Sequence, residues 1–245
     1  EEKQALQARM TASKLEQEAE QARVWTECKA RAESLWASAA DTVSNAHQYL
    51  ANKGVKAYGL RQLRDALLVP VRADAGGLVG LQFVQADGTK RFLTGTPKTG
   101  SYHRITGDMT RLLICEGYAT GASLHEATGF AVAIAIDAGN LMAVAKVLRE
   151  KLPDAELVLC AESDNVGMTK AHAAALEVDG LLAAPTFSDD STGTDFNDMH
   201  QQSGLEAVRA AIEAAAKPEA ENLRKPEIEN STILNISETT ASTGI

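Results

Sequence analysis

Apolar and polar positions follow three patterns along the chain, and the first is helical. Residues 1–40 contain no Gly or Pro. Apolar side chains recur there at roughly helical spacing, which predicts one long helix or two: Leu6, Met10, Trp25, Cys28, Leu35 and Trp36. The first half is mostly polar, so we expect a solvated connector to another domain. A short helix around residues 47–50 should end at Gly54, because glycine readily closes a helix.

The second pattern is strand-like and covers residues 67–94. Turn signals with Gly and Asp separate its apolar runs, which predicts a small antiparallel meander. The runs are 67–71, 78–84 and 89–93, and the turns are 74–77 and 87–88. A loop rich in Gly, Thr, Pro and Lys follows from Gly95 to Gly100 and leads to residues 102–104.

From Arg111 onward, continuous apolar runs alternate with helical stretches. Such runs are typical of strands covered on both faces in a parallel sheet, so we predict a doubly wound α/β layer. The strand candidates are 112–115, 131–136, 157–160 and 181–184, and the helix candidates are 119–128, 141–152, 167–178 and about 204–217. Beyond Pro218 the chain has no periodic apolar pattern, which predicts a disordered tail or linker.

Acidic side chains follow three consecutive strands of this predicted sheet. Glu116 follows the first, Asp137 the second, and Glu162 and Asp164 the third. Ligands of open parallel sheets bind beyond the carboxyl ends of the strands, so we expect these acids at one edge. Two carboxylates about 4 Å apart repel by roughly 4 kcal/mol at an effective dielectric near 20. Such a cluster must protonate one member or bind a cation. Oxygen ligands suit Mg²⁺ or Mn²⁺, which serve phosphoryl transfer.

Net charge divides by region in a way that the overall value of −9 hides. Residues 51–110 hold 9 basic and 4 acidic side chains, whereas residues 111–217 hold 7 basic and 16 acidic ones. The basic segment suits phosphate backbones and the acidic one suits divalent cations. No apolar run approaches the roughly 20 residues that cross a bilayer, so no membrane partner is expected. Three cysteines without paired spacing indicate a reducing, cytoplasmic setting. Because the sequence begins without Met, we expect a piece of a longer polypeptide.

Three short motifs resemble those of Toprim-domain primases. The stretch Glu116-Gly117-Tyr118-Ala119-Thr120-Gly121 resembles the EGYATA motif of conjugative-plasmid and satellite-phage primases. The stretch Glu162-Ser163-Asp164-Asn165-Val166-Gly167 resembles the Toprim DxDxxG motif, and Asp195-Phe196-Asn197-Asp198 resembles the D-x-N-D signature that closes this region. Together with residues 49–55 and 90–93, the resemblance covers about residues 47–200.

The resemblance implies roles for individual residues. Glu116 would act at the reacting phosphate as metal ligand or general acid/base, and Glu162 and Asp164 would bind the metal ions. The basic candidates for nucleotide or template contacts are Lys90, Arg91, Lys98, Arg104 and Lys170. The weaker acidic candidates are Asp137, offered by geometry, and Asp195 and Asp198. Lys90 and Arg91 also read as ordinary solvated strand residues, and Asp198 as a helix cap.

Two departures from the motifs bear on activity. Glu162 replaces the first Asp of DxD and adds a methylene to a metal ligand, which could shift metal preference because Mg²⁺ demands near-ideal distances. Gly121 replaces a final Ala, which should loosen the helix start by up to about 1 kcal/mol.

The expected fold is therefore a Toprim-type α/β parallel sheet flanked by helices. A basic α+β meander module and an N-terminal helix would precede it. The predicted divisions are an N-terminal helical segment 1–45, the basic part of a primase core 46–110, a Toprim domain 111–217 and a tail 218–245.

The expected function is a DNA primase core that makes short oligoribonucleotides by metal-dependent nucleotidyl transfer, in plasmid or phage DNA replication. Its partners would be single-stranded DNA, ribonucleoside triphosphates, Mg²⁺ or Mn²⁺, and a replicative helicase or further domains of a longer chain. The alternatives are a Toprim nuclease or topoisomerase-like enzyme, and an inactive module that binds DNA or a helicase.

Overall fold

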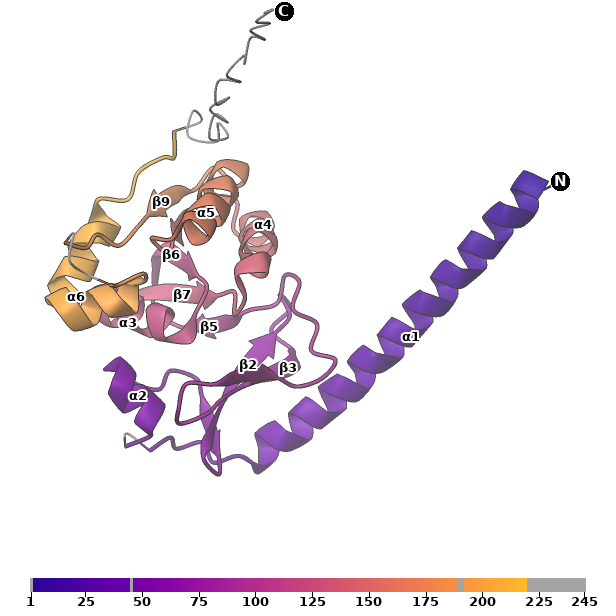
Figure 1. Cartoon of the computed structure of the whole chain (residues 1–245), viewed down its shortest axis with the longest axis horizontal. Coiled ribbons are helices and arrows are strands. Elements are labelled where there is room, and N and C mark those ends of the chain that lie inside the picture. Colours follow the sequence, from indigo (N-terminus) through magenta and orange to yellow (C-terminus); the bar gives the residue numbers. More distant parts are fainter. Residues whose placement is uncertain (1, 45, 189–191, 220–245) are drawn as a thin grey trace, which may run out of the picture.

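Two β-sheets lie side by side, one antiparallel and one mostly parallel (Figure 1). The structure is a computed structural model that describes residues 2–44, 46–188 and 192–219. Its helices are α1 (Glu2–Ser38), α2 (Gln48–Lys53), α3 (Tyr118–Thr128), the 3-10 turn η1 (Ala138–Asn140), α4 (Leu141–Lys151), α5 (Asn165–Glu177) and α6 (Phe196–Glu213). Its strands are β1 (Arg61–Leu63), β2 (Ala66–Arg72), β3 (Leu78–Val84), β4 (Lys90–Phe92), β5 (His103–Ile105), β6 (Asp108–Cys115), β7 (Phe130–Ile134), β8 (Glu156–Cys160) and β9 (Leu181–Ala183).

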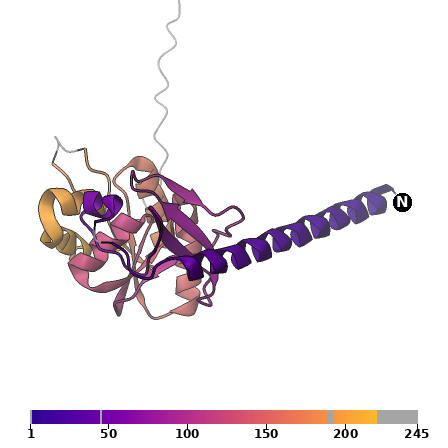
Figure 2. The ribbon, with the colours of Figure 1, turned by 90° about the horizontal axis from the view of Figure 1, so that it is seen from below.

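The N-terminal helical pattern forms one helix, α1, of 37 residues. Its last turns pack on the antiparallel sheet, where Cys28 and Ala32 are buried. Its first turns project away from the rest of the protein (Figure 2). Leu6 and Met10 are 60% and 66% exposed there, because too few apolar side chains precede residue 24 to form a face that could be buried.

The antiparallel sheet has the strand order β1-β2-β3-β4. The predicted meander corresponds to β2, β3 and β4, with Leu67 opposite Val84 and Lys90 opposite Val84 on its other side. The short strand β1 was not predicted. None of its three residues is fully buried, so it carries no apolar signal, and it is held by its hairpin with β2.

The second sheet has the order β5-β7-β6-β8-β9, with parallel pairing from β7 to β9. Strand β5 is antiparallel to β7 and was not predicted, because Ile105 is the one aliphatic residue among its three. It lies within the range assigned to the basic module, yet it completes the second sheet. The central strand is β6. The chain runs from β6 to β7 on one side and then returns past β6 to β8 on the other, which makes a topological switch point beside β6.

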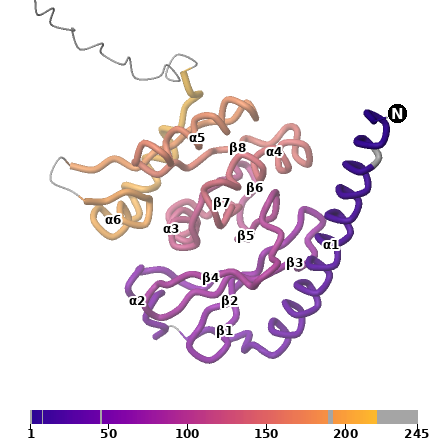
Figure 3. Tube along the Cα trace, turned by 45° about the vertical axis from the view of Figure 1, so that its right-hand side comes forward, coloured from indigo at the N-terminus to yellow at the C-terminus, as the bar shows by residue number. Residues whose placement is uncertain are grey.

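Helices cover both faces of this sheet, as the continuous apolar strands predicted. Leu113 and Cys115 of β6 face a core shared with α3 and α6, while Leu112 and Ile114 face a core shared with α4 and α5. The first core also includes Leu67 and other residues of the antiparallel sheet, so the two sheets share buried surface. Figure 3 shows them next to each other, with α1 along β3. The expected α/β fold class is confirmed.

Helix α6 begins earlier than the sequence pattern indicated. We expected a helix from about residue 204, but it starts at Phe196, because Asp195 caps it. Gly204 lies at a kink inside α6, with φ 82° and ψ 171°, which is a conformation that glycine tolerates. The tail predicted for residues 218–245 lies, from residue 220 on, outside the described residues. Among those that are described, no helix has the length and apolar character to cross a membrane.

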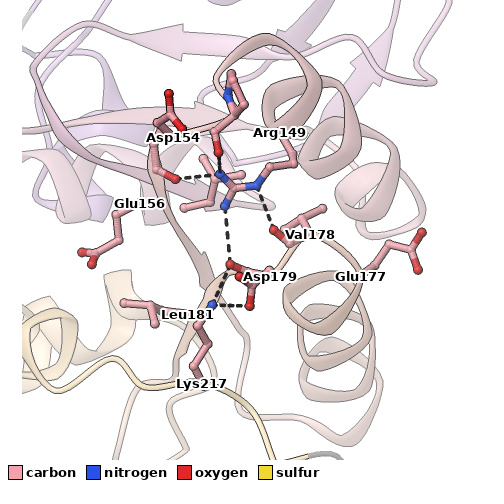
Figure 4. Close-up of a pocket in the computed structure, with 11 residues that line it drawn as sticks. Arg149, Asp154, Glu156, Glu177, Val178, Asp179, Leu181 and Lys217 are labelled. Carbon is pink, nitrogen blue, oxygen red and sulfur yellow. Dashed lines mark hydrogen bonds and ion pairs between the residues drawn. The ribbon is translucent and has the colours of Figure 1, made fainter.

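At the amino end of the parallel strands, Arg149 joins the ends of two helices (Figure 4). Its Nε donates to the carbonyl of Val178 at 2.8 Å, where α5 ends. Its Nη1 donates to the carbonyls of Pro153 at 2.8 Å and Ala155 at 2.9 Å, after α4. Val178 is the C-cap of α5, and Pro153 and Ala155 lie in the turn between α4 and β8. Arg149 therefore satisfies carbonyls that follow two helices and stabilises the edge opposite the acidic one.

Candidate active site at the carboxyl edge of the parallel sheet

Glu116 and Glu162 lie together at the carboxyl ends of two neighbouring strands. Glu116 directly follows β6, and Glu162 follows β8 by two residues. Both side chains line one small hollow of about 10 Å³, which is roughly the space of one water molecule. Lys170 and Gly167 of α5 line the same hollow. The two acids are thus brought together by the parallel pairing of β6 with β8.

The environment of Glu162 disfavours its charged form. Burial, together with the negative charges of Glu116, Asp195 and Asp164, raises the pKa of Glu162 to about 7, and the positive charge of Lys90 opposes this shift. The adjacent Gly167 allows this crowding, because a Cβ atom there would lie 2.7 Å from the Cβ of Glu162. A group titrating near neutral pH can hold or release a proton, or bind a cation, under physiological conditions.

Glu116 is half-buried in the same electrostatic field. Burial and the charge of Asp137 raise the pKa of Glu116, whereas the charges of Lys170 and Lys90 and the backbone N–H of Ala138 lower it. The two glutamates therefore repel each other between two lysines. Lysines can bind a phosphate group, and carboxylates can bind a cation. A site that has both can bind a phosphate group together with its cation.

Asp137 lies at the same edge but is engaged in an ion pair. Its Oδ2 lies 2.7 Å from Nζ of Lys98, and its Oδ1 accepts the N–H of Gly139 at 2.9 Å. The hydrogen bond from Lys98 and that N–H hold the pKa of Asp137 below its usual range. Lys98 also lies 4.9 Å above the ring of Phe92. This pair ties the loop after the antiparallel sheet to the end of β7.

Asp164 caps a helix, a role that the motif alone does not show. Its Oδ1 accepts the backbone N–H groups of Val166 at 2.8 Å and Gly167 at 2.7 Å, which caps the N-terminus of α5. Its charge still acts on Glu162. Across residues 2–44, 46–188 and 192–219, no three His, Cys, Asp or Glu side chains come together as a ready metal-binding group.

The D-x-N-D segment forms a second helix cap beside the site. Oδ1 of Asp195 accepts the N–H groups of Asn197 at 2.7 Å and Asp198 at 2.9 Å, at the start of α6. Its Oδ2 accepts the hydroxyl of Thr120 at 3.1 Å. Asp198 accepts the N–H of Thr194 at 2.9 Å, so its carboxylate is engaged locally.

The basic candidates do not all lie at the acidic edge. Lys90 lies at this edge, because a Cβ atom on Gly117 would be 3.9 Å from the Nζ of Lys90. Lys170 also lies there, since it lines the hollow of the two glutamates. Arg91 is exposed on β4. Arg104 lies elsewhere, since its charge acts on Lys151 at the far end of α4.

Thr120 is a residue of this site that the sequence analysis did not single out. Its hydroxyl links the motif after β6 to Asp195, 75 positions later in the chain. Its place inside the EGYAT stretch was the available signal.

The donor set fits a hard divalent cation with few protein ligands. Mg²⁺ usually binds one or two carboxylates plus water and substrate phosphates, rather than a cage made by protein alone. Glu116 and Glu162 offer two carboxylates in one hollow, and their mutual repulsion is what a cation would relieve.

Comparison with known proteins defines the class of this site. Residues 111–206 match the family model described as the Toprim domain. The match starts at β6 and includes all three acidic motifs. This part of the chain is therefore similar to Toprim domains.

Two curated relatives are both DNA primase TraC sequences from Escherichia coli. One is 37% identical over 157 residues, which cover 57% of this chain and 11% of that protein. The other is 36% identical over 157 residues, covering 57% of this chain and 15% of that protein. The chain thus spans a small part of the length of these relatives.

Solved primase structures share the fold. The DnaG primase catalytic domain bound to ssDNA has a TM-score of 0.55 at 15% identity, covering 80% of each chain. The primase fragment of the bacteriophage T7 primase-helicase protein has a TM-score of 0.50 at 12% identity, covering 71% of this chain and 80% of that one. The chain is thus similar in sequence to DNA primase TraC and similar in fold to primase catalytic domains.

Proposed function

We propose that this chain is the catalytic core of a DNA primase, which joins ribonucleotides on a single-stranded DNA template in plasmid or phage replication. The observation that carries the proposal is the shared hollow of Glu116 and Glu162, flanked by Lys170 and approached by Lys90. The similarity to the DNA primase TraC sequences supports the same reaction class.

The side chains at the acidic edge suit nucleotidyl transfer. A divalent cation, Mg²⁺ or Mn²⁺, would be held by Glu116 and Glu162 with a contribution from Asp164, and would supply Lewis-acid polarisation of phosphate oxygens. Lys90 and Lys170 would bind the charge of the incoming triphosphate.

The proposed partners follow from the same resemblance. Single-stranded DNA and ribonucleoside triphosphates would be the substrates, and a replicative helicase or further domains of a longer chain would deliver the template. The DnaG relative of this fold was solved with ssDNA, and the T7 relative is part of a primase-helicase. The three cysteines are free thiols, which fits the proposed cytoplasmic location.

A primer-synthesis assay tests the proposal. The protein is incubated with single-stranded template, labelled ribonucleotides and either Mg²⁺ or Mn²⁺, and oligonucleotide products are resolved by length. We expect short products from the parent protein and a loss of at least about a hundredfold in E116Q and E162Q. E206Q is the matched control, because Glu206 is exposed on α6, where it is ion-paired with Arg209.

Metal binding gives an independent measurement. Calorimetric titration with Mn²⁺ should show binding to the parent protein and to E206Q, and much weaker binding to E162Q. Absence of products with both metals would remove the primase proposal. Retained DNA binding without Mn²⁺ binding would identify an inactive binding module instead.

A further inference from the structure

One residue at the carboxyl edge of the parallel sheet has a strained backbone. Among the described residues, three that are not glycine have a positive φ: Arg64, Ile136 and Asp179. Arg64 and Asp179 are exposed, whereas Ile136 has a φ of 67° and is only 9% exposed. The left-handed region crowds the Cβ atom and is a true outlier for a β-branched side chain. Such a conformation persists only where the surrounding structure enforces it.

Ile136 comes two positions after the last residue of β7 and is bonded to Glu116. The N–H of Ala135 donates to the carbonyl of Cys115 at 2.8 Å, and the N–H of Ile136 donates to the carbonyl of Glu116 at 2.9 Å. Consecutive N–H groups of a strand normally point to opposite neighbours, but here both point to the chain at the end of β6. The main chain of Glu116 is therefore held by the strained residue.

The turn at Ile136 brings a second donor to Glu116. Asp137 and the 3-10 turn η1 follow directly. The N–H of Ala138, the first residue of η1, forms a hydrogen bond with the carboxylate of Glu116. Ala138 also lines the hollow that Glu116 shares with Glu162. The main-chain carbonyl and the carboxylate of Glu116 are thus held by two N–H groups that lie two residues apart, at Ile136 and Ala138.

A buried amide side chain holds the turn in place. Asn140 is 4% exposed, and its Nδ2 donates to the carbonyl of Ala135, directly before the strained residue, at 2.9 Å. The same Nδ2 donates to the carbonyl of Ser101 at 2.8 Å, and Oδ1 accepts the N–H of Gly100 at 2.8 Å. The main-chain N–H of Asn140 donates to the carbonyl of Asp137 at 2.9 Å. Asn140 therefore binds the chain on both sides of the left-handed residue and ties it to the loop before β5.

Neither the isoleucine nor the buried amide is what a simple turn requires. Glycine would adopt this φ without steric cost, and a buried amide is costly unless it is fully hydrogen-bonded. A metal-binding carboxylate, however, is normally oriented by hydrogen bonds from groups that do not touch the metal. Loss of such a group typically weakens metal binding by about 10- to 100-fold. The N–H groups of Ile136 and Ala138 are groups of this kind for Glu116.

We propose that Ile136 and Asn140 are positioning residues that fix the direction of Glu116. The left-handed turn, held by Asn140, keeps the N–H groups of Ile136 and Ala138 on Glu116. Without the amide of Asn140, Ile136 returns to the ordinary extended region of backbone conformation, and the N–H of Ala138 leaves the carboxylate. The inference rests on the proposed function only in that Glu116 is oriented toward a divalent cation.

Amide hydrogen exchange measures the turn without metal or substrate. Exchange of the N–H groups of residues 136 and 138 is followed by NMR in EDTA, with Val132, which is buried inside β7, as the reference for opening of the whole sheet. N140A should speed exchange at residues 136 and 138 by at least about tenfold and leave Val132 within about twofold of the parent protein. E116A should release the N–H of residue 138 alone, because the main-chain carbonyl of residue 116 remains.

A second substitution distinguishes backbone strain from general packing. Glycine adopts a positive φ freely, whereas valine keeps the β-branched side chain. I136G/N140A should therefore exchange at residue 138 at least about threefold more slowly than N140A, and I136V/N140A should exchange like N140A. A purely structural role of Asn140 predicts no rescue by glycine, since this change removes further buried apolar surface.

Mn²⁺ affinity connects the turn to the acidic edge. Calorimetric titration should show binding about tenfold weaker in N140A than in the parent protein, and partly restored in I136G/N140A. A parent protein that binds no Mn²⁺ but shows the expected exchange pattern contradicts the proposed function and still supports the positioning of Glu116. Equal acceleration at Val132 and at residues 136 and 138 in N140A, or equal exchange in I136G/N140A and I136V/N140A, overturns the inference.

Discussion

The hydroxyl of Thr120 donates a hydrogen bond of 3.1 Å to Oδ2 of Asp195, and this bond joins two acidic motifs that are 75 positions apart. The other oxygen of Asp195 caps α6. One carboxylate therefore positions a helix and adds negative charge beside Glu162. The two roles can be separated by substitution, because serine caps helices without carrying a charge.

Asp195 should show this separation experimentally. D195S retains a cap, so its free energy of unfolding should stay within about 0.5 kcal/mol of the parent, while D195A should lose about 1 kcal/mol. Both variants remove a negative charge near Glu162 and should lower its pKa. Urea unfolding measures the first effect, and the pH dependence of primer synthesis measures the second. Equal stability of D195S and D195A would contradict the capping role.

Substitution of Asp164, which caps α5, should also separate helix capping from charge. We expect its effect on activity to be larger than that of Asp195. D164S keeps the cap to Val166 and Gly167 but removes a carboxylate from the acidic edge. We expect a fall in primer synthesis of at least about tenfold with little change in stability. D164A should lose activity and about 1 kcal/mol as well. A fully active D164S would show that Asp164 serves only as a cap.

The raised pKa of Glu162 predicts a pH-dependent stability. The pKa of Glu162 is about 7 in the folded state, whereas in the unfolded chain the carboxyl loses its proton near its ordinary pKa of 4.5. Between these values the folded state binds more protons, so its stability falls as pH rises. The measurement is the Tm of the parent protein minus the Tm of E162Q, taken in EDTA. This difference should be lower at pH 8 than at pH 5.

A metal ion should reverse this trend, because it binds the deprotonated carboxylate. Mn²⁺ at pH 8 should raise the Tm of the parent protein more than that of E162Q. E206Q should follow the parent protein under both conditions. Parallel pH profiles for the parent protein and E162Q would show that Glu162 titrates normally.

Arg149 predicts a stability effect away from the active site. R149K cannot satisfy the carbonyls of Val178, Pro153 and Ala155 together. We expect a loss of about 2 kcal/mol in the free energy of unfolding, measured by urea denaturation. E150Q, an exposed neighbour on α4, should change stability by less than about 0.5 kcal/mol. A stable R149K would show that water replaces the guanidinium without cost.

The parallel sheet was predictable because its strands are buried on both faces, which requires apolar residues at successive positions of each strand. Strands β6, β7 and β8 appeared as continuous apolar runs, and their helices appeared between them. Strands β1 and β5 have three residues each, and only the last residue of each, Leu63 and Ile105, is aliphatic. Such strands leave no local pattern, so they could not be predicted.

Gly121 shows how packing changes the meaning of a motif residue. From the sequence, glycine in place of alanine should merely loosen the start of α3. In the structure, a Cβ at this position would lie 2.6 Å from side-chain atoms of Ile134 and 3.2 Å from Sγ of Cys115. The glycine allows the helix to approach the sheet closely, and this close approach could not be deduced from helix propensity.

The sequence by itself determined the alternation of strands and helices and the placing of acids at strand ends, because burial and backbone preference act residue by residue. The tertiary structure alone decided how each acid is used. Glu116 and Glu162 share a hollow, Asp137 pairs with Lys98, and Asp164 caps α5. The role of each acid depends on the side chains and backbone groups that folding brings next to it. Neither the charge of a residue nor its spacing along the chain shows which groups those will be.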